Sequence, residues 1–374
     1  MEKFLRKLYK KFLDFDRNYY LQDAKTWFGV RELKLNKKIL QKFYDNYQRF
    51  SFLEFLREIK DIIYSKNVFD FILKNSLDDW GLWYYLKFLE KEKIIKVKRN
   101  GKVIVLRKEI LKIIPKPQSE QEIKRKLERK LRIKIKGTEP VINLFKKIQD
   151  FKVKSKWDQM PISQSSAIFV VKKILENLPK KGRFLLIGDD DFISVILTLV
   201  DPKIECVVCD IDEQLLECIN ILSSKFNLKI ETRKVDLGKK KNLGEKFIGF
   251  LANPIYTEAG VKEFVKFGKN QLGKEGGVGF LEVGGDDIGS RFLFLQEFFV
   301  KNNLIVKEVI PNKIYYPHIM LHKEDKEILK RFSLMIDEKV IRRSPRLGAS
   351  LYIFNYLPFK PKKMKFKRPI YSYL

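Results

Sequence analysis

Three consecutive carboxylates follow a single glycine in the middle of the chain. Gly188 separates an apolar run of strand type, residues 184–187, from an apolar run that can begin a helix, residues 192–200. The carboxylates in this turn are Asp189, Asp190 and Asp191. A strand, a glycine turn and a helix are typical of the opening of a doubly wound nucleotide-binding sheet. The usual turn offers bare N–H groups to an anion, whereas three carboxylates attract a cation. An acidic helix cap is the simpler interpretation, but capping needs only one of the three.

Polar side chains also follow the later strand-like runs of this half of the chain. The four runs end, in order, at Asp210 and Asp212, at Asp236, at Asn253 to Tyr256, and before Asp286 and Asp287. Because helix-length stretches separate the runs, we expect a parallel sheet with its ligand at the carboxyl ends of the strands. Asp210, about twenty residues after Gly188, suits ribose hydroxyls, and Asp236 suits an adenine amino group. The residues predicted to bind an adenosine-containing molecule are Gln159, Gly188, Asp189, Asp210, Asp212, Asp236 and Pro254.

The third of these runs ends in a motif that suits chemistry on an amine. Asn253-Pro254-Ile255-Tyr256 differs at one residue from the Asn-Pro-Pro-Tyr signature of enzymes that alkylate amine nitrogens. In that signature the Asn side chain and a backbone carbonyl accept hydrogen bonds from the amine, which turns its lone pair toward the electrophilic carbon. A strand that ends in an ordinary Asn-Pro turn is the alternative interpretation.

The acidic turn and the amine motif together favour a cationic pair of substrates. S-adenosylmethionine carries a carboxylate that the three aspartates would repel, whereas its decarboxylated form keeps only an ammonium and a sulfonium. Polyamines are cationic throughout, so the combination suits transfer of an aminopropyl group to a polyamine. One of the three aspartates would accept the proton of the attacking amine. The predicted catalytic residues are Asp189, Asp190, Asp191, Asn253 and Tyr256.

These residues resemble the branched-chain polyamine synthases, which are N(4)-bis(aminopropyl)spermidine synthases of thermophiles. The resemblance covers roughly residues 50–310, and its motifs are Trp157-Asp158-Gln159, Gly188 to Asp191 with Ser194, Asp210-Ile211-Asp212, and Asn253 to Tyr256. It implies two successive aminopropyl transfers from decarboxylated S-adenosylmethionine, as co-substrate, to the central nitrogen of spermidine. The family motif is closer to Asp-Pro-Pro, so Asn253 stands in place of one carboxylate.

The charge balance keeps a second class of function open. The 374 residues include 77 Lys plus Arg against 47 Asp plus Glu, a formal net charge of +30. Such a surface suits a polyanion, although a heat-adapted composition would produce the same excess. The alternative is therefore an amine methyltransferase that uses intact S-adenosylmethionine on RNA or DNA. A nucleic-acid or protein binder with a catalytically idle Rossmann domain is a third hypothesis.

The predicted fold is α/β, with a Rossmann-like, methyltransferase-type doubly wound sheet and an N-terminal winged-helix domain. The winged helix rests on three helical patterns and on Asn100-Gly101, which joins two alternating runs as a hairpin turn does. The predicted order is a basic helical extension (1–50), the winged helix (51–112), a basic linker or helix (113–153), the catalytic domain (154–357) and a basic aromatic tail (358–374).

The remaining signals point to a protein without metal or membrane span. Cys206 and Cys209 lie in one strand-like run and should face opposite sides of it, which is poor geometry for a metal. His318 and His322 are four residues apart but lack a clear third ligand. Neither a secretory signal nor an apolar run of about 18 residues is visible, so we expect a cytoplasmic protein. We also allow for a homodimer.

Overall fold

The chain folds into two compact units in the computed structural model. The first comprises residues 1–116 and 358–374, and the second residues 117–357. The residues described by the structure are 2–27, 51–65, 67–68, 79–145, 154, 157, 159–239, 242–284, 288–317 and 345–359. None of the described helices is long and apolar enough to cross a membrane.

The first unit is a small helical domain with a two-stranded hairpin. Its helices are α1 (Glu2–Trp27), α3 (Phe52–Tyr64) and α5 (Asp79–Lys91), followed by β1 (Ile95–Val97), β2 (Val103–Val105) and a short 3-10 helix at Lys108–Lys112. The two strands are antiparallel, and Gly101 at their turn has a φ of 77°, so the predicted hairpin is confirmed. Most of the predicted second helix lies outside the described residues. The winged helix as a whole therefore stays a prediction.

The apolar face of α1 packs in the core of the first unit. Leu5, Leu8 and Phe12 recur on one face of α1 and are almost completely buried against α3 and α5. Phe12 packs on Phe55 and Tyr85 with ring centroids 5.0 and 4.7 Å apart. Residues spaced three and four apart share one side of a helix, so this pattern makes α1 part of the domain core.

The second unit is built on a mixed seven-stranded sheet. The strands are β3 (Arg183–Ile187), β4 (Glu205–Asp210), β5 (Ile230–Lys234), β6 (Gly249–Ala252), β7 (Gly277–Val283), β8 (Leu304–Pro317) and β9 (Pro345–Tyr356). Their order is β5-β4-β3-β6-β7-β9-β8, in which β3 to β7 are parallel and β8 and β9 are antiparallel to their neighbours. The doubly wound fold is thus confirmed, and the antiparallel pair is an addition that sequence patterns did not reveal. The chain reverses direction of winding at β3, which is where such sheets bind ligands.

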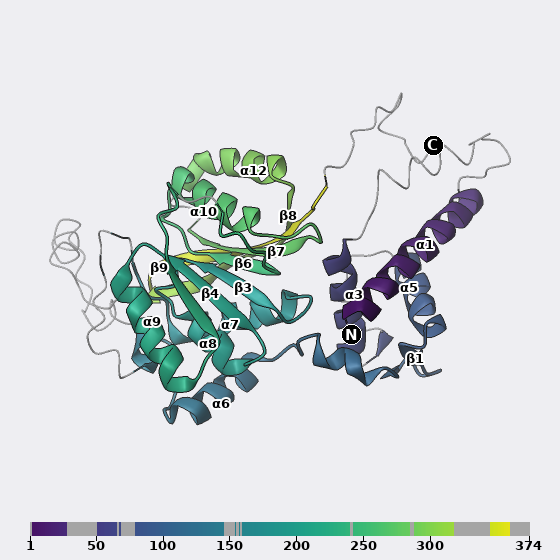
Figure 1. Cartoon of the computed structure of the whole chain (residues 1–374), viewed down its shortest axis with the longest axis horizontal. Coiled ribbons are helices and arrows are strands. Elements are labelled where there is room, and N and C mark those ends of the chain that lie inside the picture. Colours follow the sequence, from purple (N-terminus) through teal and green to yellow (C-terminus); the bar gives the residue numbers. More distant parts are fainter. Residues whose placement is uncertain are drawn as a thin grey trace, which may run out of the picture. The chain divides into compact units, whose positions relative to one another are not determined.

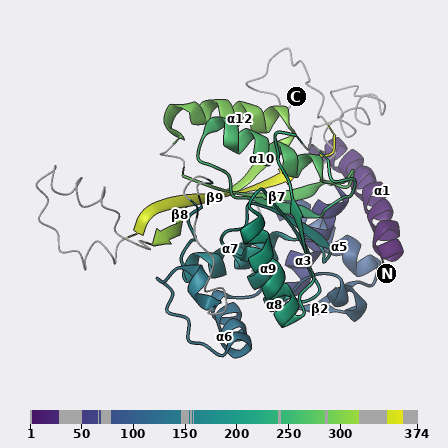
Figure 2. The same ribbon diagram turned by 60° about the vertical axis from the view of Figure 1, so that its left-hand side comes forward.

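Helices cover both faces of this sheet. On one face lie α6 (Glu120–Leu131), α7 (Gln164–Asn177), α8 (Ile193–Val200) and α9 (Glu213–Phe226), and on the other lie α10 (Glu258–Asn270) and α12 (Phe292–Lys301), as Figures 1 and 2 show. Short 3-10 helices occupy Val141–Leu144 and Gly289–Arg291. Alternate residues of β3 serve the two cores, with Phe184 on the first face and Leu185 on the second. Within the segment 113–153, α6 buries Ile123 and Leu127 in the first of these cores.

The cysteine pair follows the same alternation. Cys206 belongs to the core on the α7–α9 face and Cys209 to the core on the α10 face, and both are free thiols. The prediction that they point to opposite sides of one strand is confirmed. Burial raises the pKa of Cys206 well above its usual range, which fits a packing role rather than a reactive one.

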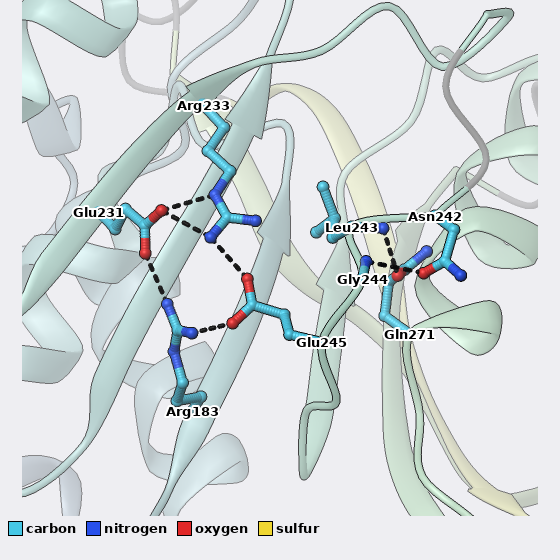
Figure 3. Close-up of polar contacts among 8 residues, drawn as sticks. All are labelled: Arg183, Glu231, Arg233, Asn242, Leu243, Gly244, Glu245 and Gln271. Atoms are coloured by element: carbon cyan, nitrogen blue, oxygen red, sulfur yellow. Dashed lines mark hydrogen bonds and ion pairs between the residues drawn. The ribbon is translucent and has the colours of Figure 1, made fainter.

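The connection between β5 and β6 has no helix in its described residues, and ion pairs cover the sheet there. Figure 3 shows Arg183 of β3 reaching across β4 to Glu231 of β5, at 2.6 Å, and to Glu245 of the connection. Arg233 closes the ring with contacts of 2.6 Å to both glutamates. The connection is fixed nearby by the Leu243 amide, which donates to Gln271 at 2.9 Å. A network of half-buried charges therefore takes the place of a covering helix.

Removing one member of this network should lower stability. We expect Glu245→Gln to cost about 1 kcal/mol, because each arginine loses a charged acceptor in a partly buried site. Thermal unfolding at low and at high salt measures this, and the cost should shrink in high salt. Glu297→Gln, which breaks the exposed pair with Lys301, is the control and should have a much smaller effect. Equal effects of the two variants would mean that the ring adds nothing beyond a surface ion pair.

Candidate active site

The predicted site begins with a close backbone approach at Gly188. Its φ of 74° lies in the left-handed region, and a Cβ atom there would stand 2.7 Å from the carbonyl oxygen of Asn253. The Gly188 amide donates to the Cys209 carbonyl at 3.0 Å, and the Asn253 amide donates to the Ile187 carbonyl at 3.0 Å. Only glycine can adopt this left-handed φ without strain and also leave room for the Asn253 carbonyl oxygen. This residue therefore holds the carboxyl ends of β3, β4 and β6 against one another.

Asp189 uses its carboxylate to cap a helix. Its Oδ1 accepts the Ile193 amide at 2.8 Å, and its Oδ2 accepts the Ser194 amide at 3.3 Å, at the start of α8. The left-handed φ of 52° at the buried Phe192 turns the chain so that both amides point back to the carboxylate. Burial raises the pKa of Asp189 well above its usual range, while the hydrogen bonds from Ser194 and Ile193 oppose this rise. Among the three aspartates, this one satisfies the helix end.

Asp190 and Asp191 are joined by one side chain of the amine motif. Asp190 accepts the Met160 amide at 2.8 Å and Asp191 accepts the Ile162 amide at 2.7 Å. The Asn253 Nδ2 group donates to both carboxylates, at 3.1 and 3.0 Å. Because two carboxylates require the nitrogen of the amide, the Asn253 Oδ1 atom is the acceptor that the side chain can offer to a ligand.

A further carboxyl group lies in this cluster that the sequence patterns did not reveal. Glu282 of β7 is 0% exposed, and its carboxyl interacts with that of Asp191. Burial, with repulsion from Asp190 and Asp189, raises the pKa of Glu282 to about 8. Burial also raises the pKa of Asp191 well above its usual range, with repulsion from Asp190 and Glu282 adding to the rise. The only sequence signal was a lone acid in the otherwise apolar run of residues 277–283.

A cavity of about 240 Å³ opens at the carboxyl ends of these strands. The predicted residues that line it are Gln159, Gly188, Asp190, Asp210, Asp236, Asn253 and Pro254. Apolar side chains, including Ile187, Val235 and Phe264, form the rest of the wall together with Trp157. Three acids in a largely apolar wall suit a nucleoside.

Asp210 and Asp212 have different roles although they are two residues apart. Asp210 lines the cavity, and burial raises its pKa although the Asp212 amide donates to its carboxylate at 2.8 Å. Asp212 is not among the residues that line the cavity. It caps α9 through the Gln214 amide at 3.1 Å, and it accepts bonds from Lys154 Nζ at 2.6 Å and Gln159 Nε2 at 2.9 Å. Burial acts to raise the pKa of Asp212, but the bonds from Lys154 and Gln159 outweigh it and lower that pKa. Its carboxylate thus positions Gln159 at the cavity.

Tyr256, the last residue of the amine motif, is not among the residues that line the cavity. Its hydroxyl is 2.6 Å from the hydroxyl of Tyr316 on β8, and the two rings meet edge to face. Burial raises the pKa of both phenols well above the usual range, and the carboxylates of Asp191 and Glu282 add to this. The pair closes the buried side of the acid cluster. Both phenols therefore remain neutral hydrogen-bonding groups.

Some residues that the sequence singled out fall in other parts of the chain. Asp158, Asp286, Asp287, His318 and His322 lie outside the described residues. Within the described ranges, no three His, Cys, Asp or Glu side chains converge in a way that could hold a metal ion.

The sequence of the second unit matches a known family. A family model described as "Branched-chain polyamine synthase A C-terminal domain" matches residues 142–340, which is more than half of the chain. This range contains the turn after β3, the amine motif and Glu282.

Two curated relatives and a solved structure are also similar to this chain. A stretch of 139 residues is 30% identical to N(4)-bis(aminopropyl)spermidine synthase from Methanocaldococcus jannaschii, covering 35% of this chain and 39% of that protein. An uncharacterized protein of the same organism is 36% identical over 136 residues, covering 36% of this chain and 34% of that protein. The chain therefore aligns with little more than a third of the length of either relative. A branched-chain polyamine synthase C9 mutein from Thermus thermophilus, solved with N4-aminopropylspermidine and 5′-methylthioadenosine, has a TM-score of 0.49 at 16% identity and covers 91% of this chain and 93% of its own.

The Gly188 geometry predicts that a single methyl group disrupts the site. We expect Gly188→Ala to lower stability by about 3 kcal/mol or more, because the methyl group clashes with the Asn253 carbonyl oxygen and the φ is unfavourable. Urea unfolding followed by tryptophan fluorescence measures the change. Gly244→Ala is the matched control, since Gly244 has a φ of 80° with no atom near a Cβ position, and it should lose only about 1–2 kcal/mol. Equal losses of stability in the two variants would mean that the close contact between residue 188 and the Asn253 carbonyl oxygen imposes no constraint.

Proposed function

The chain belongs to the branched-chain polyamine synthase family, and from this premise we propose that it is an aminopropyltransferase. Its co-substrate is decarboxylated S-adenosylmethionine, and its acceptor is the central amine of spermidine. The cavity and the acid cluster support this proposal because both substrates are cations that carry no carboxylate. The products would be 5′-methylthioadenosine and a branched-chain polyamine.

One observation carries the choice of the decarboxylated co-substrate. In a glycine turn of this kind, the free amides at the start of the following helix are the natural donors for a carboxylate ligand. Here the amides of Ile193 and Ser194 already bind the Asp189 carboxylate. The carboxylate of intact S-adenosylmethionine would therefore lack these donors and would face the Asp190 carboxylate on the cavity wall. An ammonium group in the same place is attracted instead.

Different cavity residues bind different parts of the co-substrate. Asp210 accepts hydrogen bonds from the ribose hydroxyls, and Asp236 accepts one from the adenine amino group. The apolar wall at Ile187 and Phe264 packs on the base. Asp190 then lies at the end of the cavity toward which the sulfonium and its aminopropyl chain extend.

The chemical step is an in-line displacement by a neutral amine. The amine nitrogen of spermidine attacks the carbon next to the sulfonium, a carbon–nitrogen bond forms, and the carbon–sulfur bond breaks with its electron pair passing to sulfur. The Asn253 Oδ1 atom accepts the amine N–H and so orients the lone pair. Asp190 accepts the released proton, because it is the carboxylate of the turn that lines the cavity.

A product assay tests this function against its alternative. Purified protein is incubated with decarboxylated S-adenosylmethionine and spermidine, and in parallel with intact S-adenosylmethionine and RNA or DNA. Formation of N4-aminopropylspermidine with 5′-methylthioadenosine is the expected result. Methylated nucleic acid would instead favour the amine methyltransferase that the net charge of +30 keeps open. Turnover of neither pair would contradict both.

The three aspartates should differ sharply when each is made neutral. We expect Asp190→Asn to lower kcat about 100-fold or more, since the proton acceptor at the cavity is lost. Asp189→Asn keeps an oxygen that can accept the Ile193 amide, so it should keep more than about a tenth of kcat and lose stability instead. Steady-state kinetics and thermal unfolding of both variants measure this. A larger loss of kcat in Asp189→Asn than in Asp190→Asn would contradict the roles given to them.

A further inference from the structure

Glu282 is a buried acid that no motif and no feature of the proposed mechanism explains. It comes from β7 of the mixed sheet, and its neighbour on β9 is the apolar Leu351. Neither of its carboxylate oxygens meets an N–H or O–H donor among the described residues, although both are fully buried. A buried carboxylate without donors is strongly disfavoured, so this group needs a proton or a cation.

Its immediate neighbour has the opposite arrangement. Asp191 accepts two N–H groups, from the Ile162 backbone and the Asn253 side chain, at 2.7 and 3.0 Å. Both bonds favour the ionised form of Asp191. Two carboxyl groups in contact in a buried site cannot both ionise easily, so they share a proton at neutral pH. The donors place the negative charge on Asp191, and the proton is therefore on Glu282.

We propose that Glu282 is a positioning residue of this site, a neutral carboxylic acid that donates its proton to Asp191 and so holds the Asp191 carboxylate where it fixes the Asn253 amide. The two carboxyl groups share one proton, which is covalently bonded to Glu282 and hydrogen-bonded to the ionised carboxylate of Asp191. The side-chain amide of Asn253 is held between Asp190 and Asp191. Its Oδ1 atom therefore stays directed to the substrate amine. The effect on turnover rests on the proposed aminopropyl transfer, whereas the shared proton does not.

Burial and the neighbouring carboxylates raise the pKa of Glu282, whereas its hydrogen bond with Asp191 opposes this rise. The turn after β3 brings Asp191, Asp190 and Asp189, and the neutral phenols of Tyr256 and Tyr316 close the other side. Helix α8, which follows the turn, is entirely buried and carries no ionisable side chain. Burial, with repulsion from Asp190 and Asp189, outweighs the hydrogen bond with Asp191 and keeps the pKa of Glu282 at about 8, against an ordinary 4.5. The proton therefore leaves the pair at mildly alkaline pH.

This raised pKa determines the sign of the pH dependence. Between about pH 4.5 and 8 the folded chain holds a proton on Glu282 that the unfolded chain has lost. The folded state is then favoured most below this range, and the unfolding equilibrium constant rises as pH increases, by up to about tenfold per pH unit for one proton. Glu282→Gln has no proton to lose, so its stability should decline less over the same range.

The first test measures the proton directly and needs no substrate. Infrared spectra of the full-length protein, taken from about pH 6 to about pH 9, should contain a protonated carboxyl that ionises near pH 8. Glu282→Gln should lack it, while Glu245→Gln, which alters a carboxylate outside the cluster, should keep it. Persistence of this signal in Glu282→Gln, or its absence from the unaltered protein, would overturn the proposal.

The second test asks whether the donor matters for turnover. The side-chain amide introduced by Glu282→Gln can still donate to Asp191, so we expect this variant to lower kcat by less than about tenfold near pH 7, and Glu282→Ala to lower it by about 100-fold. The ratio of kcat in Glu282→Gln to kcat in the unaltered protein should rise between about pH 7 and about pH 9, because only glutamate loses its donor. That ratio cancels the titration of the substrate amine.

The two tests separate the inference from the proposed function. Equal loss of kcat in the glutamine and alanine variants, or a ratio that is constant with pH, would show that Glu282 only fills space. If the protein transfers no aminopropyl group at all, the proposed function fails, and the infrared measurement still decides whether the proton is shared.

Discussion

Three neighbouring carboxylates can be buried in one turn only if each has its own source of hydrogen bonds. Asp189 takes the amides at the start of α8, Asp190 takes the Met160 amide, and Asp191 takes the Ile162 amide. The Asn253 side chain then bridges the last two. The segment before α7 and the end of β6 are therefore fixed by the needs of the same turn. Without these donors the desolvation of the acids would cost several kcal/mol each.

The distribution of donors also separates structure from chemistry within the turn. Asp189 uses its carboxylate to accept the first amides of α8. Asp191, next to Glu282, accepts the side-chain amide of Asn253. Asp190 remains as the acid of the turn that lines the cavity. A sequence of three identical residues thus yields a cap, a cavity acid and a buried partner. The excess of positive charge elsewhere has little influence here, because exposed charges are screened beyond about 10 Å.

Much of the fold and part of the site could be predicted from sequence, and the reasons are physical. Apolar runs that end in Asp210, Asp236 and Asn253 indicate buried parallel strands, whose ends must share one edge of the sheet. These three residues do line the cavity. The β8–β9 pair was harder to predict, because β8 is an edge strand with irregular register and exposed apolar residues such as Ile305 and Val309. Such a strand lacks the alternation that identifies half-buried strands.

The contacts of two further residues join distant parts of the chain and cannot be read from a sequence pattern. Asp212 follows a strand just as Asp210 does, yet Lys154 and Gln159 bind it away from the cavity wall. Glu282 meets Asp191 only because β7 and the turn after β3 converge in the folded chain. No spacing rule connects two residues so far apart, and a single acid in an apolar strand is an ambiguous signal. Both assignments required the packed structure.

The acidic turn should select a co-substrate without a carboxylate. Isothermal titration calorimetry of the unaltered protein with decarboxylated and with intact S-adenosylmethionine tests it most directly. We expect at least about tenfold tighter binding of the decarboxylated form, about 1.4 kcal/mol, because the α8 amides are occupied and Asp190 lines the cavity. Equal or tighter binding of intact S-adenosylmethionine would contradict it.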